Sequence, residues 1–338
     1  MHYLQRISNA MALSALLMLP AGAMAQAAKQ TSPQTSALDA YPSKPIVVII
    51  PVAAGPTDAE FRIFLPRLAE IFSQTFILEN KPGAGQSIGT AIAAKAAADG
   101  YTLLLTNGSF TVHPNFYPDL NYNVIRDFEP VTQLTERATV FVVSPAALPG
   151  VHNLKELVAW GKANPGKLNC GTSGRGSITH IVCASLAAVT NIPITAVHYK
   201  GGAQSQVDLI AGRNHFVAGN LLNALSAVKQ GKLRLIATLN PERSRVTPDI
   251  PTSLEQGFDV QYPSWLGVLA PAGTPSAIIN KLHAGLRQTV LSPEVVKQLD
   301  QQGIVPVGNG PELFRKQIAA ESARWKKIIQ ERGIKAED

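Results

Sequence analysis

Residues 171–177 form the densest group of chemically useful residues in the chain, with glycine, serine, threonine and one arginine in the order GTSGRGS. This order does not fit a nucleotide phosphate loop, because no lysine precedes a serine or threonine after the last glycine, and it does not fit the dinucleotide pattern GxGxxG. A strand, a glycine turn and a helix N-terminus remain, and the free N–H groups and dipole of such a terminus attract an anion. A tight turn that needs positive φ explains the glycines equally well, so this loop alone leaves both interpretations open.

Ser177 and His180 come nearest to a nucleophile and its base, since a spacing of three residues places them on one helix face. The serine does not lie in a GxSxG elbow, and no acidic residue nearby in sequence could orient the histidine, so we expect no catalysis. The seven histidines never occur as HxxxH or beside a cysteine. We therefore expect neither a metal site nor another cofactor.

The charged residues are scattered along the chain. Thirty Lys and Arg against 23 Asp and Glu give a formal net charge of +7, but no basic stripe with interleaved aromatic residues is present. Nucleic acid is therefore not expected as a partner. The mild positive charge is compatible with an anionic ligand.

The N-terminus has the pattern of a secretory signal peptide. Arg6 supplies a positive charge, Met11–Leu19 is apolar, Pro20 interrupts it, and Ala23-Met24-Ala25 fits the small-residue cleavage rule. The alternative is a membrane anchor, but the apolar run is much shorter than the ~20 residues that a spanning helix needs. We predict a signal peptide over 1–25, a flexible lead-in over 26–40 and a periplasmic mature protein.

The chain has two cysteines, Cys170 and Cys183. In an oxidising compartment such a pair usually forms a disulfide, and this is the interpretation we favour. Two buried free thiols are the alternative.

Strands and helices that alternate along the chain must position these residues. The β-branched run Ile46–Ile50 predicts a buried strand, and Thr57–Glu60 reads as a capping box that opens a helix to about Ser73, with a bend at Pro66. Further strands are expected at 76–79, 103–105, 139–143, 168–170, 196–199, 216–218 and 233–238, and further helices at 91–98, 154–163, from 177, 204–211, 275–290, 293–302 and 311–331. This alternation predicts an α/β protein with largely parallel sheets, whose ligand binds beyond the carboxyl ends of the strands.

Several short segments, in a fixed order, resemble the receptors of tripartite tricarboxylate transporters, also called Bug-type periplasmic solute-binding proteins. These segments are YPSKPI at 41–46, ENKPGAG at 79–85, DGYTLL at 99–104, DFEPV at 127–131, ANPGKL at 163–168, YKGG at 199–202, GKLR at 231–234 and APAGTP at 270–275. Each is weak alone. Together they make the resemblance specific over residues 41–334.

The resemblance implies an α/β, two-domain periplasmic binding protein of type II, a Venus-flytrap fold with a ligand cleft between the domains. Domain 1 would hold 41–143 and 265–338, and domain 2 would hold 144–264. It also implies a monomeric receptor, not an enzyme, that captures a small carboxylate and delivers it to the membrane subunits of a transporter. Carried over by position, the implied ligand contacts are Thr57, Asp58, Asn107, Gly108, Ser109, Ser173, Gly174, Gly176, Ser177, His180, Tyr199, Gly201, Gly202, Asn220, Ser264 and Trp265.

Two positions depart from the family pattern. Pro56 replaces a glycine and removes one N–H donor, and Gly219 replaces a bulkier or acidic residue. Helix N-termini near Thr57 and Ser177 would each suit one carboxylate, which favours a dicarboxylate. Phe110 and Trp265 could add apolar surface and Arg175 could pair with a carboxylate, so aromatic, phthalate-type acids are candidates beside succinate- and adipate-like ones.

Two other functions remain as alternatives. One is a periplasmic hydrolase on a similar scaffold that uses Ser177 and His180. The other is a binding protein that serves a signalling kinase in the membrane instead of a transporter.

Overall fold

The computed structural model describes residues 40–83, 86–115, 120–175, 177–262 and 264–332. The predicted signal peptide and residues 26–39 of the predicted lead-in lie outside these ranges. Among the helices of the described residues, none is long and apolar enough to cross a bilayer.

The first sheet has six strands in the order β11-β4-β10-β3-β1-β2. β1 runs parallel to β2 and β3, whereas β10 runs antiparallel to β3 and β4, and β11 runs antiparallel to β4. The strands are β1 (Ile46–Ile50), β2 (Phe76–Asn80), β3 (Thr102–Asn107), β4 (Phe128–Arg137), β10 (Trp265–Pro271) and β11 (Ile304–Pro306).

The second sheet has five strands in the order β7-β6-β8-β5-β9. β6 runs parallel to β7 and β8, and β5 runs antiparallel to β8 and β9. The strands are β5 (Thr139–Val143), β6 (Asn169–Thr172), β7 (Thr195–His198), β8 (Phe216–Asn220) and β9 (Arg234–Thr238). β5 therefore belongs to the second sheet, five residues before the expected start of domain 2.

The expectation of largely parallel sheets is wrong, because five of the nine strand pairings in the described residues are antiparallel. The chain passes from β4 to β5 through the single residue Ala138, so one extended segment supplies a strand to each sheet. β10 then returns to the first sheet between β3 and β4. β4, β10 and β11 were not predicted, since Pro130, Gly267 and Pro306 interrupt their apolar patterns.

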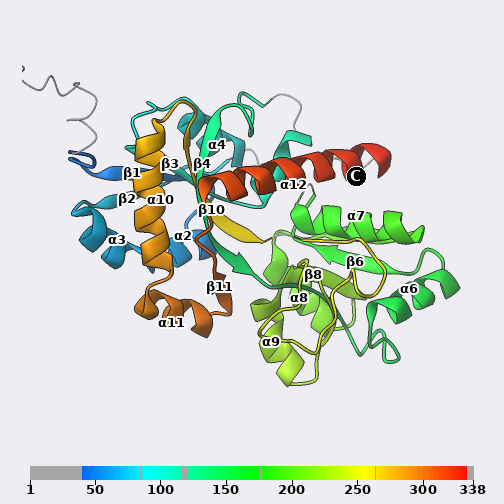
Figure 1. The fold of residues 1–338 in the computed structure, drawn as a ribbon. Helices are drawn as coiled ribbons and strands as arrows, with labels where there is room; N and C mark the ends of the chain where they lie inside the picture. Colours follow the sequence, from blue (N-terminus) through cyan, green and yellow to red (C-terminus); the bar gives the residue numbers. More distant parts are fainter. Residues whose placement is uncertain (1–39, 84–85, 116–119, 176, 263, 333–338) are drawn as a thin grey trace, which may run out of the picture. The chain divides into compact units, whose positions relative to one another are not determined.

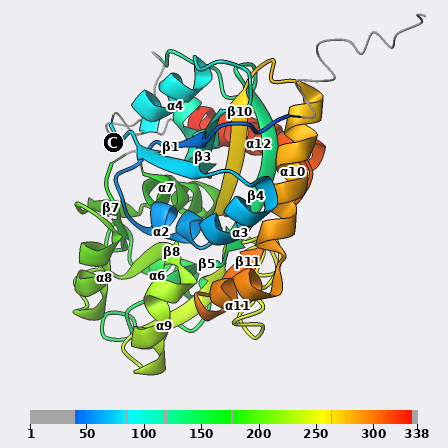
Figure 2. The ribbon, with the colours of Figure 1, turned by 90° about the vertical axis from the view of Figure 1, so that its left-hand side faces the viewer.

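The helices follow the strands, and most lie where they were predicted. They are α2 (Pro56–Arg62), α3 (Leu65–Phe72), α4 (Ser87–Ala94), α5 (Ser109–Val112), the 3-10 helix η2 (His113–Asn115), α6 (Leu154–Ala163), α7 (Ile178–Thr190), α8 (Gly202–Ile210), α9 (Leu221–Lys229), α10 (Ser276–Val290), α11 (Pro293–Gln301) and α12 (Pro311–Arg332). α6 has the predicted bounds, whereas α4 starts four residues before the predicted helix. α10 packs against β4 and α3 (Figure 2).

The predicted capping box at Thr57 is wrong. α2 begins at Pro56 with Gly55 as its N-cap, and no side chain caps it. The Glu60 carboxylate instead accepts hydrogen bonds from Thr135 and Arg137 of β4, so a tertiary contact replaces the local one. The predicted bend near Pro66 is present as a break between α2 and α3.

The C-terminal helix α12 contributes to the cores of both sheets. Phe314 and Ile318 pack with residues of the first sheet, whereas Trp325 and Ile329 belong to the core of the second. α12 accordingly contacts both α5 and α7. Figure 1 shows α12 beside α7. The last turns of the segment that was assigned to domain 1 thus pack on the second core.

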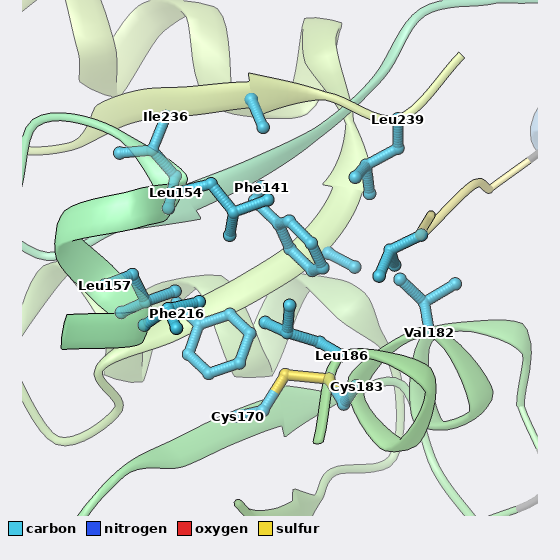
Figure 3. Packing of buried hydrophobic residues seen from close by; sticks show 14 of the residues in the cluster. Phe141, Leu154, Leu157, Cys170, Val182, Cys183, Leu186, Phe216, Ile236 and Leu239 are labelled. Atoms are coloured by element: carbon cyan, nitrogen blue, oxygen red, sulfur yellow. A yellow bond between two sulfur atoms is a disulfide. The ribbon is translucent and has the colours of Figure 1, made fainter. Parts of the chain in front are cut away.

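The predicted disulfide between Cys170 and Cys183 is confirmed, with a Cα–Cα distance of 6.3 Å. It lies in the second core beside Phe216 and Leu186 (Figure 3). The bond joins Cys170, the second residue of β6, to the second turn of α7 and closes the glycine-rich loop between them.

Candidate functional site

A cavity of about 380 Å³ lies at the carboxyl ends of β1, β3, β4 and β8, where the strand–helix pattern placed the site. We call it the first pocket. Its lining combines loops that follow these strands with the segment that enters β10. It is lined by Val52, Ala53, Ala54, Gly55, Pro56, Thr57, Glu60, Asn107, Gly108, Ser109, Arg137, Ile178, Asn220, Tyr262, Ser264, Trp265 and Leu266.

The start of α2 forms one wall of the first pocket. Because Gly55 provides no side-chain cap, the first-turn N–H groups of α2 have no partner within the helix. Thr57 lines the pocket, as the resemblance implied. Asp58 does not: it is buried and accepts a hydrogen bond of 2.8 Å from Arg62.

Asn107, Gly108 and Ser109 form a second wall after β3, and all three line the pocket as implied. The side-chain oxygen of Asn107 accepts the backbone N–H of Ser109 at 3.0 Å. This bond holds the turn between β3 and α5 and fixes the direction of the asparagine side chain.

An ion pair between Glu60 and Arg137 is the charged part of the pocket. Glu60 is 2% exposed and accepts hydrogen bonds from the Thr135 hydroxyl and the Arg137 guanidinium. Both members of the pair line the cavity. The sequence alone does not point to this pair, because Arg137 ends a strand that was not predicted and lies 77 residues from Glu60.

Beside the first pocket, hydrogen bonds connect the segments of the chain that cross between the two sheets. The side-chain oxygen of Asn240 accepts the N–H of Thr139 at 2.8 Å, and its amide nitrogen donates to the Arg137 carbonyl at 3.1 Å. The Arg137 N–H in turn donates to the Ser264 carbonyl at 2.8 Å. Burial raises the pKa of the nearby Tyr262 hydroxyl to about 12, so this hydroxyl keeps its proton well above neutral pH.

Trp265 lines the first pocket, as the resemblance implied, and its indole ring contacts α12. Its Nε1–H donates to Glu321 of α12 at 3.0 Å, and its ring packs edge-to-face on Phe314. Burial raises the pKa of Glu321, although the hydrogen bond from Trp265 acts in the opposite direction. Phe110, which was expected to offer stacking surface, is instead buried against Phe128 at a ring distance of 5.3 Å and does not line the pocket.

The glycine-rich loop after β6 is organised by its own hydroxyl groups. The Ser173 N–H donates to Thr179 Oγ1 at 2.8 Å. Ser177 is the N-cap of α7, accepts the His180 N–H at 3.3 Å and donates its own proton to the Gly174 carbonyl at 2.6 Å. Because this proton is directed to a carbonyl, the geometry does not favour Ser177 as a nucleophile.

The other described contact residues implied in this loop and at the start of α7 do not line either pocket. Gly174 has a φ of 133°, so the tight-turn interpretation holds at this position. His180 is buried and its ring lies edge-on against His198 at 4.7 Å. Ser177, Gly174 and His180 line neither pocket described here, and Gly176 lies outside the described residues.

A smaller cavity of about 170 Å³, the second pocket, shares Asn220 and Tyr262 with the first. Of the implied contacts, Ser173, Gly202 and Asn220 line it. Tyr199 does not, because its hydroxyl donates to Asp208 at 2.8 Å and accepts from Asn214 at 2.9 Å. Gly201 is the N-cap of α8, with a φ of 146°.

The described residues contain no cluster of three or more histidine, cysteine or acidic side chains that could hold a metal ion. The second pocket has no charged side chain in its lining. The two pockets together therefore offer one cation, one anion, hydroxyl and amide groups, and helix N-termini. Such a set of groups is typical of a site that binds a polar small molecule.

Two sheets of mixed α/β structure with a polar pocket at the strand ends define a solute-binding protein of the periplasmic type. Residues 61–334 match the family described as "Tripartite tricarboxylate transporter family receptor", and the chain belongs to this family. It is 34% identical to protein BugT of Bordetella pertussis over 301 residues, which cover 88% of this chain and 92% of BugT.

Two solved structures from Rhodopseudomonas palustris are similar to this chain. One is Rpa4515 with adipate, which is 28% identical with a TM-score of 0.74 over 87% of this chain and 99% of that one. The other is MatC with bound malate, which is 28% identical with a TM-score of 0.71 over 86% of this chain and 100% of that one. The family and these neighbours confirm the predicted class of protein.

Proposed function

We propose that the first pocket binds a small dicarboxylate, which the protein delivers to the membrane subunits of a tripartite tricarboxylate transporter. The observation that carries the proposal is the Arg137 guanidinium in the pocket wall. Within the described residues it donates a side-chain hydrogen bond only to Glu60, which leaves other N–H groups of its fork for a ligand carboxylate. The uncapped start of α2 adds further donors.

The names of two similar structures support a dicarboxylate. Adipate and malate, the acids bound to the two Rhodopseudomonas palustris proteins, both carry two carboxylates. The hypothesis that the N-termini of α2 and α7 each hold one carboxylate stays a prediction: Ile178 at the start of α7 lines the first pocket and Thr179 lines the second, whereas the N-cap Ser177 lines neither. Trp265 and Ile178 add apolar surface, so aromatic diacids of the phthalate type stay candidates beside aliphatic ones.

Isothermal titration with adipate, succinate, terephthalate and benzoate tests the ligand class. We expect the diacids to bind and benzoate to bind more weakly, because it has one carboxylate. The proposal fails if no carboxylate binds below ~1 mM, about −4 kcal/mol. The preference for diacids fails if benzoate binds as tightly as every diacid.

A double variant tests the role of Arg137. Glu60→Gln/Arg137→Gln removes the cation without leaving a buried carboxylate unpaired, and we expect it to weaken diacid binding by about 30-fold or more. Arg126→Gln is the matched control, because Arg126 is exposed and pairs with Asp127 away from the pocket. Equal affinities of the two variants would contradict the assignment.

We propose that the protein binds its ligand and catalyses no reaction. Ser177 directs its proton to a carbonyl, which gives the hydrolase alternative no support. Incubation with ester derivatives of the bound acid should therefore give no hydrolysis. The receptor and signalling alternatives are separated by whether the protein, loaded with ligand, restores uptake in vesicles that hold the transporter subunits.

The proposal also covers organisation and location. We propose a periplasmic monomer of two domains, with the second boundary at 264/265. The first boundary moves from 143/144 to the start of β5, because Thr139–Val143 pairs with β8 and β9 and so joins domain 2. Intact mass of the exported protein should match a chain that begins at Gln26. Light scattering should give the mass of one chain.

A further inference from the structure

Glu321 is an acidic residue of α12 that the proposed binding of a diacid does not use. The salt bridges that α12 forms within the described residues leave it out, and Arg324 on the next turn pairs with Asp259 at 2.9 Å instead. The Glu321 side chain is only partly exposed. A carboxylate that is removed from water without a cation needs hydrogen-bond donors, so its neighbours indicate its role.

Two segments beside the first pocket supply donors to Glu321. The Trp265 Nε1–H, at the start of β10, donates to both carboxylate oxygens, at 3.2 and 3.0 Å. The Thr111 hydroxyl of α5 donates to Oε2 at 3.2 Å. A third donor, Gln317 Nε2 at 3.0 Å, comes from the preceding turn of α12. Glu321 therefore joins α12 to β10 and to α5.

Thr111 extends this contact to the turn between β3 and α5. Its hydroxyl also lies 2.9 Å from the Gly108 carbonyl, and its backbone N–H donates to the same carbonyl at 3.2 Å. A hydroxyl has one proton, so when it donates to Glu321 the N–H still serves Gly108. Gly108 lines the first pocket, and Thr111 is fully buried. One residue thus separates the carboxylate from this wall of the pocket.

The packing of α12 gives the carboxylate a fixed position. Ile318 precedes Glu321 and packs in the core of the first sheet, whereas Trp325 follows it and packs in the core of the second. Trp265 is 3% exposed, and its ring packs on Phe314 of the same helix. Because both ends of this part of α12 are anchored, the carboxylate can hold the segments that it contacts in one arrangement.

We infer that Glu321 is a positioning residue of the first pocket, which holds the start of β10 and the turn at 107–109 in the arrangement that binds the ligand. Glu321 does not line the pocket, so it acts through Trp265 and Thr111. This inference rests on the proposed function. The alternative is a structural role alone, in which the carboxylate satisfies two buried donors and ligand affinity does not depend on it.

Isothermal titration of the mature chain with adipate, succinate and terephthalate tests the inference. Glu321→Leu removes the acceptor and keeps a side chain of similar size, and we expect each diacid that the parent binds to bind about tenfold more weakly. Glu321→Gln keeps an oxygen for the Trp265 N–H and offers an N–H to Thr111 Oγ1, so binding should recover to within about threefold of the parent.

Gln317→Leu is the matched control. It removes a donor to the same carboxylate, but Gln317 belongs to α12 itself and lines neither pocket. We expect this variant to bind the diacids like the parent protein. A loss as large as that of Glu321→Leu would show that any change around the carboxylate weakens binding, and the inference would be wrong.

The indole N–H signals distinguish positioning from a general loss of structure. The protein has three tryptophans, and in spectra of protein labelled with ¹⁵N-tryptophan the variant Trp265→Phe identifies the signal of Trp265. In Glu321→Leu this signal should shift and its proton should exchange faster, whereas the Trp160 signal should not move. Gln317→Leu should leave both signals in place. An unmoved Trp265 signal in Glu321→Leu would contradict the inference.

A double-mutant cycle shows whether Glu321 acts through the two walls. Thr111→Val/Trp265→Phe removes both donors and keeps similar shapes, so adding Glu321→Leu should weaken diacid binding by less than about twofold more. A further tenfold loss would mean that Glu321 acts by another route. If Glu321→Leu does not fold, Thr111→Val alone still tests the contact, with an expected loss of about threefold. Unchanged affinity in Thr111→Val would then count against it.

These outcomes separate the inference from the proposed function. If the parent protein binds no diacid, the proposed function is wrong and the inference fails with it. If the parent binds a diacid and Glu321→Leu binds it as tightly, only the positioning role is wrong, and the receptor function stands.

Discussion

The two pockets are built by different chemistry. The first contains a buried ion pair, Glu60 and Arg137, contributed by a helix and a strand that lie far apart in sequence. The second has no charged side chain and lies next to a loop closed by a disulfide. Its lining combines hydroxyls, amides and two strand glycines with the aliphatic side chains of Val142, Val217, Ala218, Ala224 and Leu233. The first pocket therefore depends on a charge pair between distant residues, and the second depends on uncharged groups that β5, β6, β8, α8 and α9 bring together.

This difference indicates separate roles for the two pockets. A guanidinium binds a carboxylate strongly and with defined geometry, so under the proposed function we expect the first pocket to supply most of the affinity. The hydroxyls and amides of the second pocket are uncharged and should contribute less per contact.

The largest expected effect comes from breaking the ion pair of the first pocket. Arg137→Ala leaves the Glu60 carboxylate buried without its cation, which should lower the free energy of unfolding by about 3–5 kcal/mol in urea. Glu60→Gln/Arg137→Gln should recover most of this loss. Arg243→Ala removes the partner of Glu255 from an exposed pair and should cost far less stability, because solvent screens exposed charges. Equal costs for the two arginines would show that the first pocket does not depend on its charges.

Removal of the disulfide tests the dependence of the second pocket on its loop. Cys170→Ala/Cys183→Ala opens the loop that carries Ser173 and Thr179, and the entropy of closing a loop of this length predicts a loss of about 3 kcal/mol. Alkylation of the denatured protein should modify no cysteine before reduction and both after it. Two reactive thiols before reduction would contradict the bond.

Acid should lower the stability of the protein through His113, the first residue of η2. Burial lowers the pKa of His113 to about 4, so the unfolded chain takes up a proton between about pH 6.5 and 4 that the folded protein excludes. Stability is therefore lost as the pH falls through this window, by no more than about 3 kcal/mol. Urea unfolding of His113→Gln should show a smaller loss between pH 7 and 4. An unchanged pH profile would exclude this histidine as the cause.

The smallest expected effect on stability comes from substitutions at the N-termini of α7 and α2. Ser177→Ala removes the N-cap of α7 and should lower the free energy of unfolding by about 1 kcal/mol, whereas Ser177→Gly should cost only a few tenths. Thr57→Ala should leave stability unchanged, because Thr57 does not cap α2, but it should change ligand affinity. If Thr57→Ala lowered the free energy of unfolding as much as Ser177→Ala, Thr57 would act as a cap, in contradiction to the structure.

Local patterns were sufficient for much of the fold. Ile46–Ile50 reads as a buried strand and Leu154–Ala163 as a helix because their apolar spacing acts over a few residues, and the structure has both with these bounds. The loops after β1 and β3 were placed at the site for a similar reason, since strand ends carry the turns that bind ligands. Turn composition also identified the loop that the disulfide closes.

What the sequence by itself determined is the class of protein, the order of most elements and the pairing of its two cysteines. Only the tertiary structure decided the charge of the first pocket and the space in the second. Arg137 enters the site because β4 pairs between β10 and β11, and Gly219 adds room because a Cβ there would meet no heavy atom within 4 Å. Such contacts join residues far apart in the chain, and no local periodicity or propensity encodes which of them meet.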